Sequence, residues 1–240
     1  MEALHPGDPA SLASVSRGRR LALVAAYALA AVASLALILA AWQDWLVLPL
    51  NQTEVLAFVT GAWSVWFAAR NNAWTWPIGV LNSAFFVVLF WESRLYFDMS
   101  LNVFYVVTSL WGWWVWLFGG ERHTEKPVER VSRREILAVC LAGLLLTAAM
   151  WHGGLLIDDA APFLDALTTG LSVIAQWLLM RRLIEHWYFW IAADLVYVPL
   201  YVWRDLPLTA VLYAIFLLMC LRGLVEWRAI LRRQAEGVAA

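Results

Sequence analysis

Charged residues are scarce in this chain of 240 residues, and their scarcity decides its class. Asp, Glu, Lys and Arg make up 15% of the sequence, whereas 63% of the residues are hydrophobic. A soluble domain is about 25% charged and about 45–50% apolar. Together with a mean hydropathy of +0.69, this composition excludes an ordinary soluble enzyme and predicts a protein embedded in a membrane.

Several motifs that carry chemistry are also missing. The sequence has no GxxxxGK[ST] phosphate-binding loop, which argues against ATP-driven transport by this chain alone, and no HExxH or GxSxG motif of a protease or esterase. Its four histidines are scattered, so we expect no metal site and no cofactor, and no basic, aromatic surface suggests a nucleic-acid partner. Cys140 and Cys220 lie inside apolar runs, where we expect small buried side chains and no disulfide.

Long apolar runs are abundant. A helix needs about 20 apolar residues to cross a bilayer, and irregular backbone cannot face lipid, so the runs predict an all-α integral membrane protein with eight transmembrane helices. We expect a disordered cytoplasmic N-terminus over residues 1–20, an extra transmembrane helix over 21–42, three spans over 53–70, 75–91 and 95–118, a linker helix over 135–151, three spans over 160–181, 185–203 and 207–227, and a cytoplasmic tail over 228–240.

The basic residues set the orientation of these spans. With the N-terminus inside, all but two of the 17 lysine and arginine residues fall in cytoplasmic segments, the exceptions being Arg94 and Arg204. Cytoplasmic loops of membrane proteins carry an excess of Lys and Arg. We therefore expect both termini in the cytoplasm.

An internal repeat relates the two groups of three spans. Residues of the same type recur at a constant offset of 111 positions, which we call the repeat offset. Trp66 matches Trp177, Arg70 matches Arg181, Trp76 matches Trp187, Gly112 matches Gly223, and Trp116 matches Trp227. The linker helix returns the chain to the starting face, so the two triplets, 53–118 and 160–227, point the same way. This predicts a 3+1+3 core of two parallel three-helix repeats, as in transporters that hold substrate near mid-membrane. An unrelated eight-helix bundle is the alternative.

Polar and aromatic side chains follow one face of several spans, at intervals of three and four residues that share a helical face. Polar residues inside a membrane are costly unless they face the protein interior or a water-filled cavity. We therefore expect a common substrate-binding site formed by Asn82, Asn102, Tyr105, Gln176, Trp187, Trp190, Asp194 and Tyr197. Trp187 and Trp190, spaced three apart, suit stacking on a planar ligand.

Simpler interpretations remain for part of this pattern. Small and hydroxylated residues such as Ser109 and Ser172 commonly pack helices together. Asp98 lies near the outer surface, where it could be solvated or cap its helix. The tryptophans at the inner end of the span over 95–118 predict an interfacial belt: Trp111, Trp113, Trp114 and Trp116.

The stretch WPIGVLNSAFFVVLFWESRLYFDMSLNVFYVVTSLWGWWVW, from Trp76 to Trp116, resembles the core of the PnuC family of bacterial vitamin transporters. The resemblance rests on the Trp-Pro-Ile-Gly with Asn82, on the LYFD segment that ends at Asp98, and on the Asn, Tyr and Gly-Trp that follow it. WYFWIAADLVYVPLY, residues 187–201, echoes the pattern in the second half.

The resemblance implies a SWEET-related fold, a homotrimer in the bacterial inner membrane, and uptake of nicotinamide riboside by facilitated diffusion, with intracellular phosphorylation trapping the product. Such a nucleoside has a flat cationic ring that suits Trp and Tyr faces and a ribose that suits amides, whereas a phosphate would need basic residues inside the spans. A transporter of the same fold for thiamine or another vitamin is the first alternative. A membrane-embedded enzyme or a sensor subunit is the second, and the missing catalytic motifs count against it.

Overall fold

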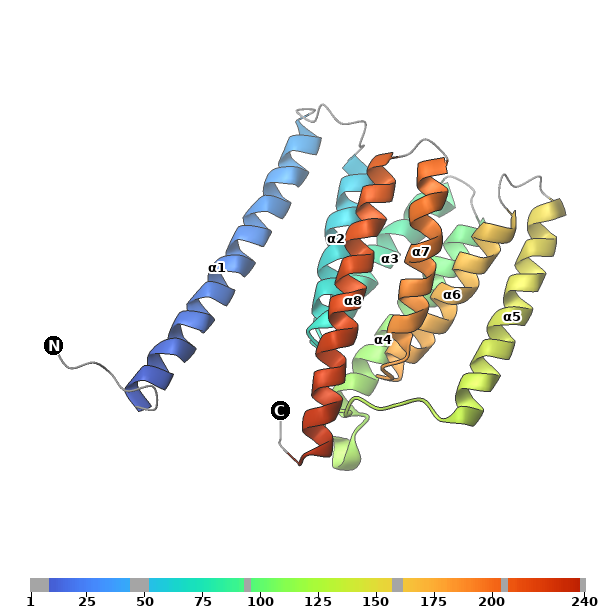
Figure 1. The fold of residues 1–240 in the computed structure, drawn as a ribbon. Helices are drawn as coiled ribbons and strands as arrows, with labels where there is room; N and C mark the ends of the chain where they lie inside the picture. The colour runs from blue at the N-terminus through green and yellow to red at the C-terminus, as the bar shows by residue number, and fades with distance from the viewer. Residues whose placement is uncertain (1–8, 44–51, 93–95, 157–161, 204–206, 238–240) are drawn as a thin grey trace. The chain divides into compact units, whose positions relative to one another are not determined.

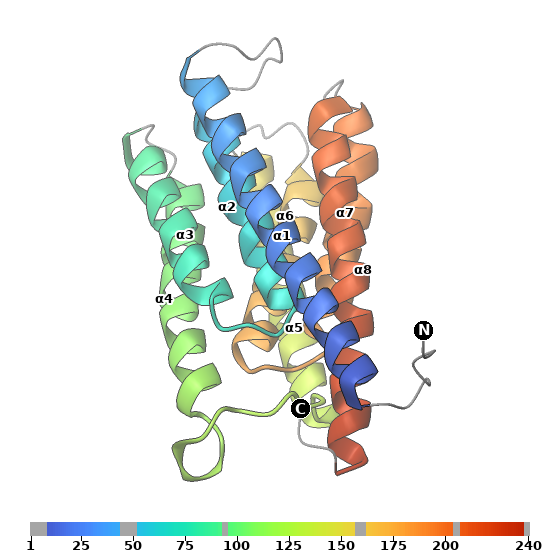
Figure 2. The same cartoon turned by 90° about the vertical axis from the view of Figure 1, so that its left-hand side faces the viewer.

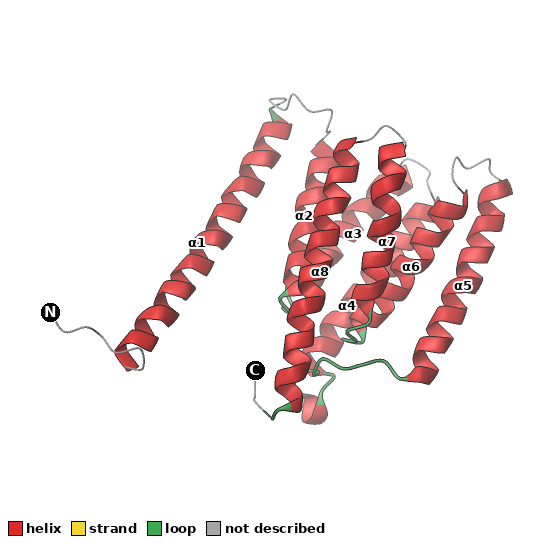
Figure 3. Cartoon of the chain, viewed as in Figure 1, coloured by secondary structure: helices red, strands yellow, loops and turns green. Residues whose placement is uncertain are grey.

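The described part of the chain is built from α-helices joined by loops (Figures 1 and 3). The computed structural model describes residues 9–43, 52–92, 96–156, 162–203 and 207–237. Its elements are α1 (Pro9–Trp42), α2 (Gln52–Ala69), α3 (Thr75–Glu92), α4 (Tyr96–Phe118), a short 3-10 turn η1 (Glu121–His123), α5 (Arg133–Leu156), α6 (Pro162–Met180), α7 (His186–Trp203) and α8 (Pro207–Ala235). The chain divides into two compact units, Met1–Val59 and Thr60–Ala240.

The first unit holds α1 and the beginning of α2. The sequence predicts disorder over residues 1–20, but the structure continues α1 back to Pro9, and residues 1–8 lie outside the described part. Proline is favoured at the first helical position because its missing N–H has no partner there. The residues that follow include Ala, Leu and three arginines, which are good helix formers, and the helix begins before the apolar run.

The other helices end within a few residues of the predicted limits, except for α5 and α8. α5 runs over Arg133–Leu156, and α8 continues to Ala235 through most of the predicted tail. Arg232 and Arg233 lie in the last turn of α8, where positive charge interacts favourably with the helix dipole. Apolar length alone therefore underestimates helices that continue past the apolar run.

Four helices of the described residues are long and apolar enough to cross a membrane: Met99–Phe118, Arg133–Leu156, Pro162–Met180 and Ala210–Ala235. Shorter apolar stretches occur in α1, α2 and α3. The sequence predicts eight spans. α7 has 18 residues but includes a histidine, an aspartate, three tryptophans and three tyrosines, all of which lower its hydropathy. Four of these eight residues, Trp187, Trp190, Asp194 and Tyr197, are predicted to bind a ligand.

Within the second unit, α6 has the most neighbours, because it packs against α4, α5 and α7. α3 packs against α4, and α7 lies beside α8 (Figures 1 and 2). Small residues let α5 and α6 approach closely: Gly143 faces Ile174, and Gly170 faces the hydroxyl of Thr147. α5 is thereby attached to one side of α6, while the other helices form the remainder of this unit.

The turns that follow α2 and α6 share their backbone hydrogen bonds at the repeat offset. The amide of Asn71 donates to the carbonyl of Ala68, and that of Arg182 donates to the carbonyl of Leu179, both over 2.9 Å. Asn71 and Arg182 also both adopt left-handed backbone, with φ of 53° and 59°. This conformation is uncommon for residues other than glycine. Its recurrence at two positions separated by the repeat offset therefore indicates that the two turns have the same backbone conformation.

Two tryptophans, Trp116 in the last turn of α4 and Trp227 within α8, make reciprocal contacts with these turns. The indole N–H of Trp116 donates to the carbonyl of Leu179 over 3.0 Å, and that of Trp227 donates to the carbonyl of Ala68 over 2.9 Å. The two acceptors are separated by the repeat offset, and so are the two donors. Each half of the unit therefore holds the first turn of the other half by the same bond.

The rings of the repeated tryptophans pack in the same way in both halves. Trp76 meets Trp116 edge to face with centroids 5.3 Å apart, and Trp187 meets Trp227 edge to face at 6.0 Å. A Cβ on Gly112 would lie 2.5 Å from the Trp76 ring, and one on Gly223 would lie 2.5 Å from the Trp187 ring. Only glycine fits under either ring. We call the rings Trp76, Trp116, Trp187 and Trp227 the tryptophan frame.

Two smaller predictions are wrong. Cys140 is exposed on α5, not buried, and Cys220 alone of the two is buried; both are free thiols. The sequence predicts Trp116 in an interfacial belt, but Trp116 is completely buried, because its indole bonds to Leu179 and packs against Trp76. Trp111, Trp113 and Trp114 are exposed, as a belt requires.

Candidate binding cavity

A cavity of about 380 Å³ lies inside the second unit. Its lining comes from α2, α3, α4, α6, α7 and α8. Pockets for small molecules commonly measure about 300–1,000 Å³. The cavity is therefore large enough for a compact ligand, and helices that precede and follow α5 in the chain contribute to its wall.

Seven of the eight predicted binding residues line this cavity: Asn82, Tyr105, Gln176, Trp187, Trp190, Asp194 and Tyr197. The eighth, Asn102, is not among the lining residues; it is half-buried on α4, three residues before Tyr105. The polar stripes of α3, α4, α6 and α7 thus meet at one place, with Asn102 beside it on its helix.

The two tryptophans predicted to stack on a ligand are placed differently. Trp187 is only 1% exposed and is enclosed by Gly223, His186 and Trp227. Trp190 is partly buried, so it is the better placed of the two to present a ring face to a ligand.

The amide side chains on the lining already bond to hydroxyl groups of neighbouring helices. Gln176 donates from Nε2 to Oγ1 of Thr108 and to Oγ of Ser109, each over 3.3 Å, and Asn82 donates from Nδ2 to Oγ1 of Thr60. The Gln176 contacts join α6 to α4. Ser109 thus has the helix-packing role that the sequence allows for it, while Gln176 belongs both to this packing and to the wall.

Four polar atoms of lining residues have no hydrogen-bond partner among the described residues. They are the indole nitrogens of Trp76 and Trp187, Nε2 of His186 and Oδ2 of Asp194, and all are buried. Nδ1 of His186 lies 2.7 Å from the carbonyl of Leu183, to which it must donate, so Nε2 of the neutral ring is an acceptor. Buried polar atoms are nearly always satisfied, and these four could be satisfied by a ligand.

Sequence reasoning missed several lining residues, notably Trp76, His186, Tyr213 and Cys220. Trp76 could have been found, because the repeat offset matches it to Trp187. His186 stands directly before Trp187, but in the sequence it is only one of four scattered histidines. Tyr213 stacks on Tyr201 with centroids 5.1 Å apart, a contact between helices that no spacing within one helix could reveal.

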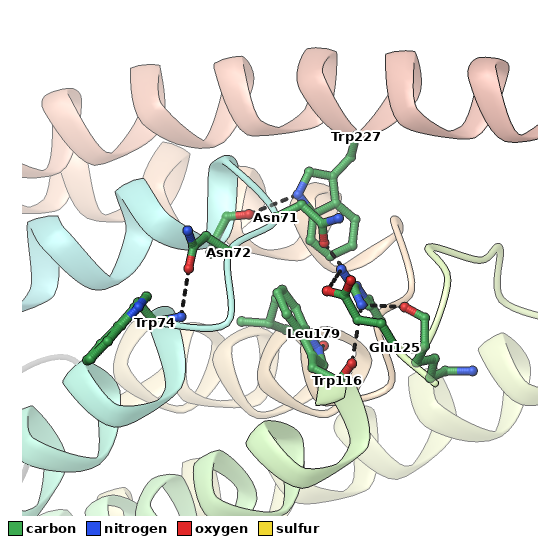
Figure 4. Close-up of polar contacts among 10 residues, drawn as sticks. Asn71, Asn72, Trp74, Trp116, Glu125, Leu179 and Trp227 are labelled. Atoms are coloured by element: carbon green, nitrogen blue, oxygen red, sulfur yellow. Dashed lines mark hydrogen bonds and ion pairs between the residues drawn. The ribbon is translucent and has the colours of Figure 1, made fainter. Parts of the chain in front are cut away.

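Arg182, in the turn after α6, connects the turn after α2 with the end of α4 and the segment that follows it. It donates from Nε to Oδ1 of Asn71 over 2.9 Å, to the carbonyls of Trp116 and Lys126, and to Oε1 of Glu125 over 3.0 Å. Figure 4 shows Asn71, Trp116 and Glu125 gathered at this point. Burial lowers the pKa of the Arg182 guanidinium, and the charge of Glu125 acts in the opposite direction. The side chain remains a cation at neutral pH.

Comparison with known proteins decides the family. Residues 51–229 match the family model described as nicotinamide mononucleotide transporter. The chain belongs to this family. It is 22% identical over 208 residues to the nicotinamide riboside transporter PnuC of Escherichia coli, covering 74% of this chain and 85% of that protein. It is 25% identical over 193 residues to the PnuC of Neisseria mucosa, covering 75% and 73%.

A relative with a different named substrate matches as well as these. The riboflavin/roseoflavin transporter RibM of Streptomyces davaonensis is 23% identical over 195 residues, covering 78% of this chain and 89% of that protein. The crystal structure of the vitamin B3 transporter PnuC superposes with a TM-score of 0.62 at 24% identity, covering 85% and 92%. The two chains share a fold. The resemblance to PnuC is thus confirmed, and the chain is a multi-pass membrane protein.

Proposed function

We propose that this protein carries nicotinamide riboside into the cell across a bacterial inner membrane by facilitated diffusion, and that phosphorylation inside the cell traps the product. One observation carries the proposal: seven predicted binding residues line a single cavity with no lysine or arginine among its described lining residues. An aromatic wall with amides and one carboxylate suits a flat cationic ring and a ribose. A phosphate would favour a cationic partner, so this lining supports the nucleoside over the mononucleotide.

The architecture that we propose for this function is eight transmembrane helices, with α1 followed by a 3+1+3 core. The recurrence of turns, indole hydrogen bonds and ring packing at the repeat offset supports two repeats related in this way. The distribution of Lys and Arg supports cytoplasmic termini. A homotrimer is proposed from the resemblance to the family, and light scattering of the detergent-solubilised protein measures it.

Flux in proteoliposomes tests the transport proposal. We expect labelled nicotinamide riboside to equilibrate across the membrane without ATP and without an ion gradient, and unlabelled riboside to compete. Uptake that requires a proton or sodium gradient would contradict facilitated diffusion. Unlabelled nicotinamide mononucleotide, thiamine and riboflavin complete the panel; riboflavin is included because of the relative that carries that name.

Two single substitutions test the site. Trp190→Ala removes a ring from the wall and should weaken riboside binding about tenfold, within the range of one cation–π contact. Asn102→Ala alters the predicted residue that lies beside the cavity, and its effect decides whether Asn102 belongs to the site. Trp203→Ala is the matched control, because Trp203 is exposed at the end of the same helix. Equal affinity in Trp190→Ala and Trp203→Ala would remove Trp190 from the site.

A further inference from the structure

The second half of the repeat places a carboxylate where the first half has a hydroxyl. The repeat offset matches Asp194 to Ser83, and both residues line the cavity. Asp194 is 5% exposed, and its Oδ2 has no hydrogen-bond partner among the described residues. The Cys220 thiol lies close enough to this carboxyl group for the two to interact electrostatically. The cavity wall therefore has a buried carboxyl group, one oxygen of which has no hydrogen-bond partner among the described residues.

No basic side chain faces this carboxylate from the described lining. The other ionisable groups there are those of Cys220, His186 and three tyrosines, Tyr105, Tyr197 and Tyr213, none of which supplies a permanent positive charge. The His186 ring uses Nδ1 for the Leu183 carbonyl. A buried charge without a partner costs several kcal/mol. A cationic occupant of the cavity would neutralise it, whereas a neutral or anionic occupant would leave that cost in place.

We infer that Asp194 selects the charge of the transported ring, so that the cavity takes a permanently cationic planar heterocycle and discriminates against a neutral ring of the same shape. This inference rests on the proposed function and adds the basis of its specificity. The partly buried Trp190 supplies a ring face that also attracts cations. A phosphate on the ligand would bring negative charge next to this carboxyl group.

Binding to purified protein tests the inference with two ligands that differ in ring charge. Nicotinamide riboside carries a pyridinium cation, and its reduced dihydropyridine form is neutral. We expect the wild type to bind the cation at least about tenfold more tightly, since opposite charges about 4 Å apart interact by several kcal/mol at the effective dielectric of a protein. Equal affinities in the wild type overturn the inference, whatever any variant does.

Asp194→Asn keeps the shape of the side chain and removes its charge. Binding of the cation should weaken at least about tenfold, while binding of the neutral form stays within about threefold. Gln176→Ala is the matched control: it alters the same wall without changing its charge, so both forms should weaken by the same factor. A preference that survives in Asp194→Asn overturns the inference.

Failure of the proposed function gives a different result. If the wild type binds neither form of the riboside, nicotinamide riboside is not the substrate, and thiamine and riboflavin become the comparison. Thiamine carries a permanent cationic ring and riboflavin a neutral one. Preference for thiamine supports charge selection by Asp194, and preference for riboflavin, or binding of neither vitamin, overturns it.

Discussion

The two halves of the second unit, residues 60–118 and 162–235, agree in their frame and differ in their wall. The four rings of the tryptophan frame contact glycines and turns, and these contacts recur at the repeat offset: Trp116 bonds to Leu179 as Trp227 bonds to Ala68. These contacts fix how the helices of one half meet those of the other. They require a ring above a glycine, which is why the same residue types occupy both copies.

The wall has different residues at matching positions. Three such pairs are Ser83 and Asp194, Gly79 and Trp190, and Thr75 and His186, and all six residues line the cavity. In each pair the second half has the larger or more ionisable side chain. The contacts of the indoles and turns thus recur in both halves, whereas the side chains that line the cavity differ at these three pairs; Asn82 and Tyr105 of the first half also line it.

The largest loss of stability should come from removing the Arg182 side chain, which makes more hydrogen bonds than Asn71 at the matching position of the first half. Arg182→Ala removes hydrogen bonds to Asn71, Glu125 and two carbonyl groups, and should lower the free energy of unfolding by about 3–4 kcal/mol, since bonds to charged groups contribute about 1.5–3 kcal/mol each and do not add fully. Asn71→Ala, at the matching position, removes one of these bonds and should cost about 1–2 kcal/mol. Unfolding in mixed micelles measures both.

The double variant sharpens this result. Because Arg182 and Asn71 bond to each other over 2.9 Å, the two costs should be less than additive. Full additivity would contradict energetic coupling through this bond, and equal costs for the two single variants would contradict the larger role of Arg182.

A smaller and symmetric loss should follow from adding a methyl group under either frame ring. Gly112→Ala and Gly223→Ala each place a Cβ 2.5 Å from a buried indole, and overpacking of this kind costs about 1–3 kcal/mol. Gly153→Ala is the control, because a Cβ there meets nothing within 4 Å. Thermal midpoints that fall equally in the two frame variants and do not fall in the control support equivalence; a fall in one frame variant alone contradicts it.

Much of this organisation can be predicted from the sequence, and the limits have physical causes. Apolar run length finds the helices because crossing a bilayer fixes their length, and the repeat offset identifies the frame because matching contacts need matching residues. Asn102 is not among the lining residues, because a spacing of three residues leaves it about 60° away from Tyr105 around the helix. Periodicity therefore predicts a face but not which residue of that face borders a cavity.

Arg182 shows a second limit. Counting basic residues near membrane faces treats each as a solvated cytoplasmic charge, yet Arg182 is 3% exposed. Its partners come from three separate segments, including the stretch after α4 that holds Glu125. Which of two adjacent arginines, Arg181 or Arg182, turns inward depends on the turn's backbone conformation. The left-handed φ at Arg182 belongs to tertiary structure, which spacing does not encode.

A loss of about 1 kcal/mol should follow from removing one indole hydrogen bond of the frame. Trp116→Phe and Trp227→Phe each abolish a single bond to a backbone carbonyl, the usual contribution of which is about 1 kcal/mol. Trp111→Phe, at an exposed position on the same helix as Trp116, should change stability by less than about 0.5 kcal/mol. Unequal costs for Trp116 and Trp227, measured by the same unfolding assay, would show that the two bonds are not equivalent.

The smallest change should come at Gly79, which the repeat offset matches to Trp190. A Cβ on Gly79 would meet the hydroxyls of Ser64 and Ser109 at 3.5 and 3.6 Å, an ordinary contact distance, so Gly79→Ala should alter stability by no more than about 1 kcal/mol, as for Gly153→Ala. Gly79 lines the cavity, however, and an added methyl group takes space opposite the larger side chains of the second half. Affinity for the riboside should fall a few-fold, by about 1 kcal/mol at most, in Gly79→Ala and remain unchanged in Gly153→Ala. If both variants bind as the wild type does, the missing side chain at Gly79 leaves room that the ligand does not use, and the difference between the two halves at this pair has no role in binding.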